Sequence, residues 1–388
     1  WYNQTELKLK GVTASGAWSS ASPMSIAAVY RGGGGTQTAA FAAGGSPSPV
    51  GGVATEEYNG SGWSAGGDIG TARYEIGSAG TLTAGLIFGG YTGSGSPGAS
   101  EEYNGSAWTG GGTLNVARYS QGGFGIQTAA VYSSGFNPSS LQTDTEEYNG
   151  TSWSEGNNPA QARYDVGTGG TLTAGIIFGG QGATSPVVYA NTELYDGTNW
   201  TAGPAMNTAR SQLGGSGTQT AAIGFGGRST PVVAITEQFD GTSWSEVGDL
   251  GTARRQLSST RVETGNTAAL AIGGGTPSAT ALTEEWNFTA NTVVPATWSS
   301  GGNLNAARFK MEMNGTQTAT IAMGGGTMPS PPSSTTNSEY YDGSSWTAQP
   351  AMNNSRQRGG AGAFGTQTAA MSVSGVRNPP APSNTVTD

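Results

Sequence analysis

Histidine and cysteine are both absent from this chain of 388 residues. Without histidine, the protein lacks the commonest general base and a frequent metal ligand. Without cysteine, it has no disulfide, no zinc–thiolate site and no thiol nucleophile. We therefore expect a protein that is not an enzyme and that carries no cofactor and no metal.

Charged residues and long apolar runs are also scarce. The chain has 16 basic and 25 acidic residues, which give a net charge of −9 and an isoelectric point of about 4.6. An acidic surface repels phosphate backbones, so we do not expect nucleic acid as a partner. No apolar run approaches the roughly 20 residues of a membrane-spanning helix, so we expect no membrane insertion.

What the chain does have is a recurring unit, seen most clearly at residues 145–180, TEEYNGTSWSEGNNPAQARYDVGTGGTLTAGIIFGG. Residues 146–148 predict a short strand, and Asn149-Gly150 suits a tight hairpin turn. Trp153 opens a second strand, residues 162–164 begin a third, and residues 170–180 form a fourth. Such a four-stranded antiparallel sheet cannot bury both faces alone, so it needs neighbours of its own kind.

Two landmarks of this unit occur eight times, mostly 44 to 50 residues apart. The tryptophans are Trp18, Trp63, Trp108, Trp153, Trp200, Trp244, Trp298 and Trp346. The glycines that open GTQTAA, GTLTAG or a looser variant are Gly35, Gly80, Gly125, Gly170, Gly217, Gly265, Gly315 and Gly365. Glycine is abundant enough to suggest disorder, but a disordered chain has no use for periodic aromatic residues. Four strands at this period predict an all-β fold, an eight-bladed β-propeller of four-stranded blades that forms a single domain over residues 1–388.

The order of motifs within the unit is characteristic. An arginine is followed by a strand, Phe-Gly-Gly, a variable loop, and then EEYNG or DGTNW before the next arginine. This order resembles the kelch repeat over nearly the whole chain. The near-identical GTQTAA copies are also similar to kelch-like repeats in structural and tail proteins of marine bacteriophages. The first resemblance implies a kelch-like propeller, and the second implies a place in a phage particle.

The two termini complement each other. Asp388 follows Gly375 by 13 residues, as the acidic residue follows the double glycine in other copies, and Trp1-Tyr2-Asn3 supplies the residues that should come next. We therefore expect the ring to be closed by joining N- and C-terminal strands in one blade. Because the chain begins at Trp1 without methionine, we also expect a fragment or a processed product.

The loops point to one face. We letter the strands of a blade a to d, where arginine opens a, Phe-Gly-Gly ends b, the acidic residue opens c and tryptophan opens d. The b-to-c and d-to-a connections then share a face. The b-to-c loops vary most: 46–54, 91–99, 136–145, 181–191, 228–235, 276–282, 326–337 and 376–386. On the opposite face the hairpins at 3–17 and 287–297 are enlarged.

Binding residues are expected on that variable face, because rigid sheets position loops for recognition. Aromatic faces can stack on sugar rings, and arginine can pair with acidic groups. The residues that break the repeat there are our candidates, against the alternative that they are ordinary solvated loop residues: Tyr91, Phe136, Tyr189, Arg228 and Arg377.

Glutamates and arginines form two columns through the repeats. Six glutamates are each followed 17 residues later by an arginine: Glu56 by Arg73, Glu101 by Arg118, Glu146 by Arg163, Glu193 by Arg210, Glu237 by Arg254 and Glu339 by Arg356. Glu284 and Arg308 keep the order at a longer spacing, and the first repeat has Ala28 in place of arginine. We expect a ring of charge-assisted hydrogen bonds that locks blade to blade. The alternative is an arginine ring at the channel mouth that binds an anion.

Other functional motifs have simpler structural explanations. The sequence from Asp196 to Trp200 only partly matches the Asp box of sialidases. Paired carboxylates such as Glu56-Glu57 repeat identically, which indicates scaffold, since an active site normally breaks a repeat. Calcium binding by Asp144, Glu146 and Glu147 lacks calcium-loop spacing. Asn59, Asn104 and Asn149 match the glycosylation pattern, but their place in hairpins predicts turns.

These observations favour a non-enzymatic binding or structural module. We expect a virion-associated tail or fibre propeller that contacts a host surface glycan or another virion protein, located on the virion or extracellularly, within a larger polypeptide or assembly. The alternatives are a secreted bacterial carbohydrate-binding propeller and a purely structural decoration protein. A hydrolase is a more distant alternative.

Overall fold

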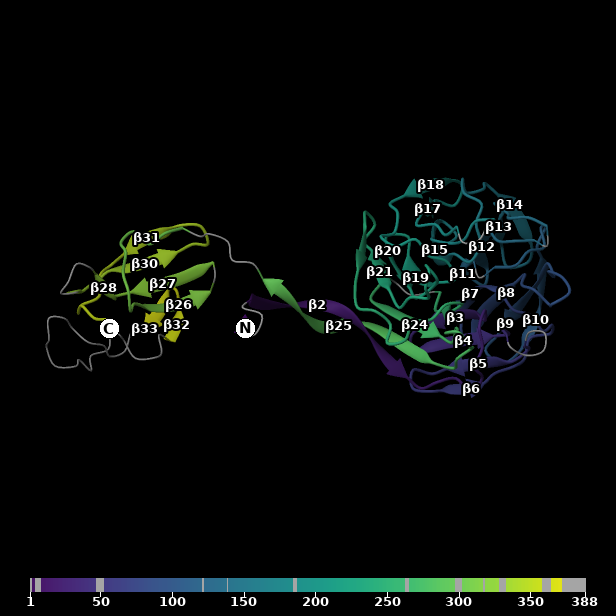
Figure 1. The fold of residues 1–388 in the computed structure, drawn as a ribbon, viewed down its shortest axis with the longest axis horizontal. Helices are drawn as coiled ribbons and strands as arrows, with labels where there is room; N and C mark the ends of the chain where they lie inside the picture. Colours follow the sequence, from purple (N-terminus) through teal and green to yellow (C-terminus); the bar gives the residue numbers. More distant parts are fainter. Residues whose placement is uncertain are drawn as a thin grey trace. The chain divides into compact units, whose positions relative to one another are not determined.

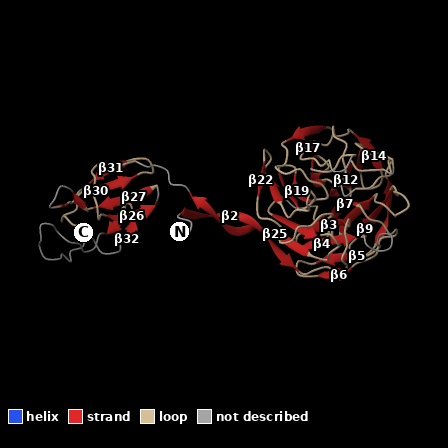
Figure 2. Cartoon of the chain, viewed as in Figure 1, coloured by secondary structure: helices blue, strands red, loops and turns tan. Residues whose placement is uncertain are grey.

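The computed structural model describes residues 2–3, 8–46, 52–120, 122–137, 139–183, 187–261, 265–296, 302–316, 318–327, 333–357 and 364–371. These residues form strands, turns and loops, with no helix among them (Figure 2). The chain divides into two compact units, Val12–Val294 and a smaller one of Trp1–Gly11 with Pro295–Asp388. The expectation of a single domain over residues 1–388 stays a prediction.

Six sheets follow one another in the larger unit, and neighbouring strands within each are consecutive in the chain except in the last. The first sheet is β3 (Gly32–Thr36), β4 (Ala39–Ala43), β5 (Thr55–Tyr58) and β6 (Trp63–Ala65); the second is β7 (Gly77–Thr81), β8 (Ala84–Phe88), β9 (Ala99–Tyr103) and β10 (Trp108–Thr113); the third is β11 (Phe124–Ile126), β12 (Ala129–Ser133), β13 (Thr145–Tyr148) and β14 (Trp153–Gly156). The fourth is β15 (Gly167–Thr171), β16 (Ala174–Phe178), β17 (Thr192–Tyr195) and β18 (Trp200–Gly203); the fifth is β19 (Gly214–Thr218), β20 (Ala221–Phe225), β21 (Thr236–Phe239) and β22 (Trp244–Glu246). The sixth contains β23 (Ser258–Ser259), β24 (Ala268–Ile272), β25 (Thr283–Ala296) and β2 (Lys8–Ala21).

The first strands of these sheets contact one another in cyclic order, β3, β7, β11, β15, β19, β23 and back to β3. Figure 1 shows β6, β10, β14 and β18 at the rim of this unit and β3, β7, β11 and β15 nearer its middle. Radially arranged, antiparallel four-stranded sheets are the architecture of a β-propeller. The predicted all-β propeller fold is confirmed.

The predicted closure through both termini needs correction. Residues 376–388 lie outside the described part of the chain, but β2, which carries Trp18, was expected to complete the C-terminal blade. It instead lies next to β25 and completes the sixth sheet. Trp18 packs there against Trp286 and Phe225, with ring centroids 5.5 and 4.7 Å apart. The cycle of inner strands thus closes within Val12–Val294.

One hydrogen bond recurs at all six junctions of the cycle. The indole Nε1–H of each d-strand tryptophan donates to the hydroxyl of the threonine or serine at or next to the start of strand c in the preceding sheet. The pairs are Trp108–Thr55, Trp153–Ser100, Trp200–Thr145, Trp244–Thr192, Trp18–Thr236 and Trp63–Thr283, at 2.8 to 3.1 Å. A buried indole N–H needs an acceptor, so each tryptophan fixes the position of its sheet against the one before it.

The inner strands are formed by glycine-rich sequence that was not predicted as strand. Residues 162–164 were expected to begin the third strand, but the strand is Gly167–Thr171, and residues 170–180 form its turn and the next strand. Glycine is needed because aromatic rings of the adjacent sheet approach the backbone. A Cβ atom on Gly215 of β19, for example, would lie 2.9 Å from Cζ of Phe178.

Two further turns have clear local causes. Asn149 accepts the N–H groups of Thr151 and Ser152 on its Oδ1, both at 2.9 Å, and Gly150 has a φ of 90°. The predicted turn role of this Asn-Gly pair is therefore confirmed. At the end of β16, Gly179 has a φ of 67°, and a Cβ atom there would lie 2.6 Å from the carbonyl oxygen of Arg210.

The smaller unit repeats the same design. Its sheet is β26 (Glu312–Thr316), β27 (Ala319–Met323), β30 (Ser338–Tyr341) and β31 (Trp346–Gln349), and β26 contacts the hairpin of β32 (Phe364–Thr366) and β33 (Ala369–Met371). The short strands β28 (Gly326–Thr327) and β29 (Ser333–Ser334) pair with each other, and β1 (Tyr2–Asn3) pairs with residues 8–9. The larger unit contains six sheets, and the smaller unit adds one four-stranded sheet and the hairpin of β32 and β33. Together they account for the eight repeats expected from the sequence.

Candidate binding site at the propeller axis

The predicted arginine and glutamate columns are buried and paired. Each arginine forms an ion pair with a glutamate of its own sheet, not with the glutamate 17 residues earlier. The pairs are Arg73–Glu101, Arg118–Glu146, Arg163–Glu193, Arg210–Glu237, Arg254–Glu284 and Arg308–Glu339, at 2.6 to 2.8 Å. Arg356 is also buried. The columns therefore join strands a and c within a sheet, which corrects the expected lock between blades.

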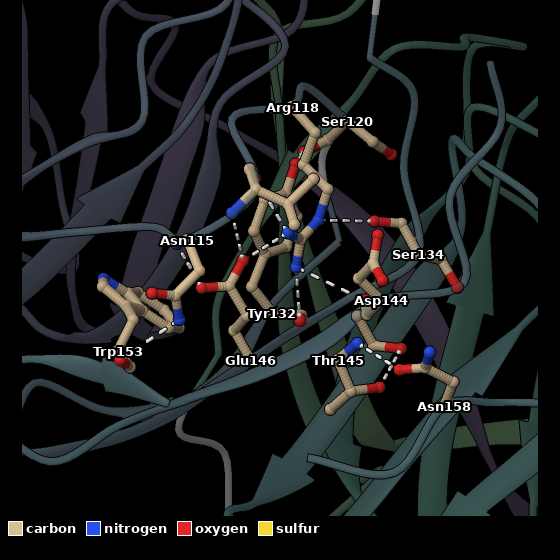
Figure 3. Close-up of polar contacts among 12 residues, drawn as sticks. Asn115, Arg118, Ser120, Tyr132, Ser134, Asp144, Thr145, Glu146, Trp153 and Asn158 are labelled. Carbon is tan, nitrogen blue, oxygen red and sulfur yellow. Dashed lines mark hydrogen bonds and ion pairs between the residues drawn. The ribbon is translucent and has the colours of Figure 1, made fainter. Parts of the chain in front are cut away.

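The pair of Arg118 and Glu146 shows the chemistry in most detail (Figure 3). Glu146 accepts a hydrogen bond from Arg118 at 2.6 Å and also accepts the backbone N–H groups of Asn115 and Val116. The guanidinium donates its remaining N–H groups to carbonyl oxygens of Val116, Tyr132, Ser134 and Asp144. Both side chains are fully buried. Their burial leaves no surface on which this arginine could bind an anion.

The expected gap in the columns at Ala28 is filled by a residue that the sequence did not reveal. The backbone of Ala28 does occupy the arginine position, since its carbonyl accepts the N–H of Gly274 as the carbonyl of Arg73 accepts that of Gly45. Glu56 pairs instead with Arg31, which lies three residues after Ala28, with 2.6 Å between Nη1 and Oε2. The signal was present as an arginine where most other repeats carry an apolar residue.

The second carboxylate of each Glu-Glu pair joins neighbouring sheets. Tyr148 donates its hydroxyl to Glu102 and Tyr58 donates to Glu285, both at 2.6 Å. Tyr103 and Tyr195 make the equivalent bonds to Glu57 and Glu147. Paired carboxylates thus have two structural roles, one inside a sheet and one between sheets, as expected for scaffold.

A ring of hydrogen bonds surrounds the propeller axis. It is formed by one residue from each sheet, two positions after the arginine column: Tyr30, Glu75, Ser120, Asp165, Gln212 and Gln256. Five of the bonds run from a backbone N–H to the carbonyl of the preceding member, and the sixth runs from the N–H of Asp165 to the Ser120 hydroxyl, all at 2.8 to 3.1 Å. All six residues have positive φ. We call them the axial ring.

The side chains of the axial ring form a polar cluster. The Tyr30 hydroxyl accepts hydrogen bonds from Gln212 and Gln256 at 2.6 and 2.8 Å. Burial and then repulsion from Asp165 raise the pKa of Glu75 to about 8. Burial raises the pKa of Asp165 to about 6, although the neighbouring Gln212 side chain and the charge of Arg255 act in the opposite direction. The two acids therefore favour their neutral forms at pH values where free carboxyl groups are ionised.

Glu75 should make stability depend on pH. Its pKa is about 8 in the folded state, against an ordinary value of 4.5, so the folded protein binds more protons than the unfolded chain between these values. The free energy of unfolding should then fall as pH rises from about 5 to about 8. Glu75→Gln, which stays neutral, is expected to flatten this fall, as measured by urea unfolding at a series of pH values. Glu155→Gln, at an exposed position of β14, is the control, and identical slopes for wild type and Glu75→Gln would contradict the assignment.

A second ring of residues lies beside the axial ring, and we call it the mouth. In each sheet, the residue after the arginine column bridges to the residue after the double glycine. The six bridged pairs are Val29–Ser46, Tyr74–Tyr91, Tyr119–Phe136, Tyr164–Gln181, Ser211–Arg228 and Arg255–Gly275. These positions break the repeat, because each sheet contributes a different pair.

Aromatic residues occupy one side of the mouth. Tyr74, Tyr91, Tyr119, Phe136 and Tyr164 form a continuous series in which successive ring centroids are 5.2 to 5.8 Å apart. All five are partly exposed. Tyr30 of the axial ring extends the series, 6.4 Å from Tyr74. We call these six residues the aromatic arc.

Arginines occupy the other side of the mouth. Arg228 and Arg255 are partly exposed, and neither forms an ion pair or side-chain hydrogen bond with the described residues. Their bridge partners, Ser211 and Gly275, are too small to cover them. The charge of Arg228 opposes the rise in pKa that burial causes at Tyr164, so this arginine lies near the end of the aromatic arc.

The structure therefore brings together three of the five candidate residues. Tyr91, Phe136 and Arg228 occupy equivalent mouth positions. Tyr189 lies elsewhere, in the loop before β17, where its backbone N–H bonds to Gly180. Arg377 lies outside the described residues. The sequence analysis missed four mouth residues that directly follow the arginine column, namely Tyr74, Tyr119, Tyr164 and Arg255. It also missed Glu75 and Asp165, which follow the column by two residues.

Comparisons with known proteins support the fold. No protein family model matches the chain, and no curated protein matches it. The chain is similar to the solved structure of YjhT, with 14% identity and a TM-score of 0.57 over 68% of this chain and 95% of that one. A likeness at this identity supports the propeller fold and nothing further.

Other site types find no support in the described residues. They contain no group of three or more Asp, Glu, His or Cys side chains placed to hold a metal ion. No helix in this part of the chain is long and apolar enough to cross a membrane.

Proposed function

We propose that the chain is a non-enzymatic binding module that holds a saccharide at the mouth of the larger unit. The observation that carries this proposal is the aromatic arc, in which six neighbouring rings replace the regular repeat on one side of the axis. Identical repeats need no such asymmetry to hold the ring together. Propellers suit this role because rigid sheets position the residues at their openings.

The chemistry of the arc fits a sugar ring. Tyrosine combines a flat apolar face with a hydroxyl group, so it can stack on C–H groups and also form hydrogen bonds. A tyrosine hydroxyl is protonated at neutral pH and can donate a hydrogen bond, and burial raises the pKa of Tyr119 further, to about 12. Partly exposed aromatic rings next to polar groups are typical of ligand sites.

For the wider setting, we propose a phage tail or fibre protein that contacts a host surface glycan or another virion protein. Support comes from the resemblance of the GTQTAA repeats to phage structural proteins and from the asymmetry of the mouth. A secreted bacterial carbohydrate-binding propeller would use the same mouth. A purely structural decoration protein would not need it, so loss of binding on changing the mouth separates these possibilities.

An array of bacterial surface polysaccharides tests the proposal. The full chain should bind specific glycans, and Tyr91→Ala should weaken that binding at least about tenfold, which corresponds to about 1.4 kcal/mol. As the matched control, Tyr340→Ala removes a partly exposed tyrosine of the smaller unit and should leave binding unchanged. Equal loss in both variants, or no glycan binding at all, would contradict the proposal.

A further inference from the structure

We infer that the saccharide held at the mouth is acidic, with a carboxylate that pairs with Arg228 and Arg255. This inference rests on the proposed function and names its ligand class. It starts from a contrast among the arginines of the larger unit. Those of the structural column are buried against a glutamate, whereas these two are partly exposed and form no ion pair or side-chain hydrogen bond with the described residues.

The two arginines are placed to act together with the aromatic arc. Arg228 comes from the fifth sheet and Arg255 from the sixth, at bridged positions of the mouth. The charge of Arg228 opposes the rise in the pKa of Tyr164 at the end of the arc, and the charge of Arg255 opposes the rises at Tyr30 and Asp165 of the axial ring, so each arginine lies near these groups. A single sugar residue stacked on the arc could therefore direct a carboxylate towards them.

The axial ring supplies groups for the hydroxyls of the same sugar. Asp165 Oδ1 and Gln212 Oε1 are both buried acceptors that have no hydrogen-bond partner among the described residues. Buried polar atoms normally find a partner, and an unsatisfied one points to a missing donor. Sugar hydroxyl groups are donors of the required kind. The mouth thus offers stacking faces, acceptors for hydroxyl groups and two guanidinium groups.

A carboxylate-bearing sugar matches all three features. A neutral sugar would leave both guanidinium groups without a partner, whereas arginine binds carboxylates through paired, charge-assisted hydrogen bonds. A polyphosphate chain would supply negative charge but no ring face that could stack on the aromatic arc. The ligand class is therefore a uronic-acid-type sugar within a polysaccharide.

Calorimetric titration with matched oligosaccharides tests this inference. We would use oligomers of galacturonate, glucuronate and guluronate, each beside its carboxyl-reduced neutral counterpart, with the full chain. At least one acidic oligomer should bind tenfold or more tightly than its reduced form. Arg228→Gln with Arg255→Gln should remove that preference, while Lys310→Gln, an exposed cation of the smaller unit, should preserve it.

The outcomes separate the two proposals. Equal binding of acidic and reduced oligomers, sensitive to Tyr91→Ala, would overturn the acidic ligand and keep the saccharide site. A preference for the acid that survives in the double arginine variant would also overturn the inference. If no acidic or neutral saccharide binds, the proposed function itself fails. Circular dichroism of each variant would show that it is folded.

Discussion

Arg118→Ala is expected to lower the free energy of unfolding by about 3–5 kcal/mol, the usual cost of removing one partner of a buried ion pair. Glu146 would keep its charge in a fully buried position with only the N–H groups of Asn115 and Val116 as partners. Several carbonyl oxygens that the guanidinium now satisfies would also lose their donor. The loss should appear as a lower midpoint in urea or thermal unfolding.

The matched control is Arg228→Ala, which removes the same side chain from a partly exposed site. Because Arg228 has no ion pair with the described residues, its loss should change stability by about 0.5 kcal/mol or less. Glu56→Ala would test the buried pair of Glu56 and Arg31 in the same way. If Arg118→Ala unfolds at the wild-type midpoint, the column has no role in stability and its burial needs another explanation.

The repeats could be predicted from sequence because their signals are local. The acidic-aromatic run at 145–148 and the tryptophan that follows correspond to β13 and the start of β14, joined by the expected Asn-Gly turn. Alternation and turn chemistry need no knowledge of the rest of the chain. The inner strands escaped prediction because glycine normally weakens strands. Here glycine is required by Phe178, whose ring would also collide with a Cβ atom on Gly224, 2.7 Å away.

The site could be predicted only in part, for a related reason. Tyr91, Phe136 and Arg228 stood out because each follows a double glycine and departs from the repeat. Asp165 departs just as clearly, but it follows the arginine column inside what was expected to be a strand, and Tyr119 belongs to an Ala-Arg-Tyr run that recurs at 72–74, 117–119 and 162–164. The six residues of the axial ring all have positive φ, which no local sequence signal indicates. These residues are identified by their position in the ring of sheets, and not by residue type.

A chain that lacks residues 302–388 is expected to keep the larger unit folded, because all six indole hydrogen bonds lie outside the deleted segment. Its main unfolding transition should shift by about 0.5 kcal/mol or less, as for changes away from a packed core. Removing residues 1–21 should do the opposite. That deletion takes away β2 with Trp18, so Phe225 and Trp286 lose their packing partner.

Truncating a large aromatic residue in a core costs roughly 3–5 kcal/mol, and the second deletion removes both the partly buried Trp18 and its strand, so we expect a loss of about this size. The sixth sheet would also lose its last strand, which leaves the edge of β25 unpaired. Calorimetry of the two truncated chains separates the two ways of closing the propeller. A ring of eight closed through both termini would be opened by either deletion, so both would then be destabilised alike. A cycle that closes on β2 and β25 predicts that only the loss of residues 1–21 is damaging.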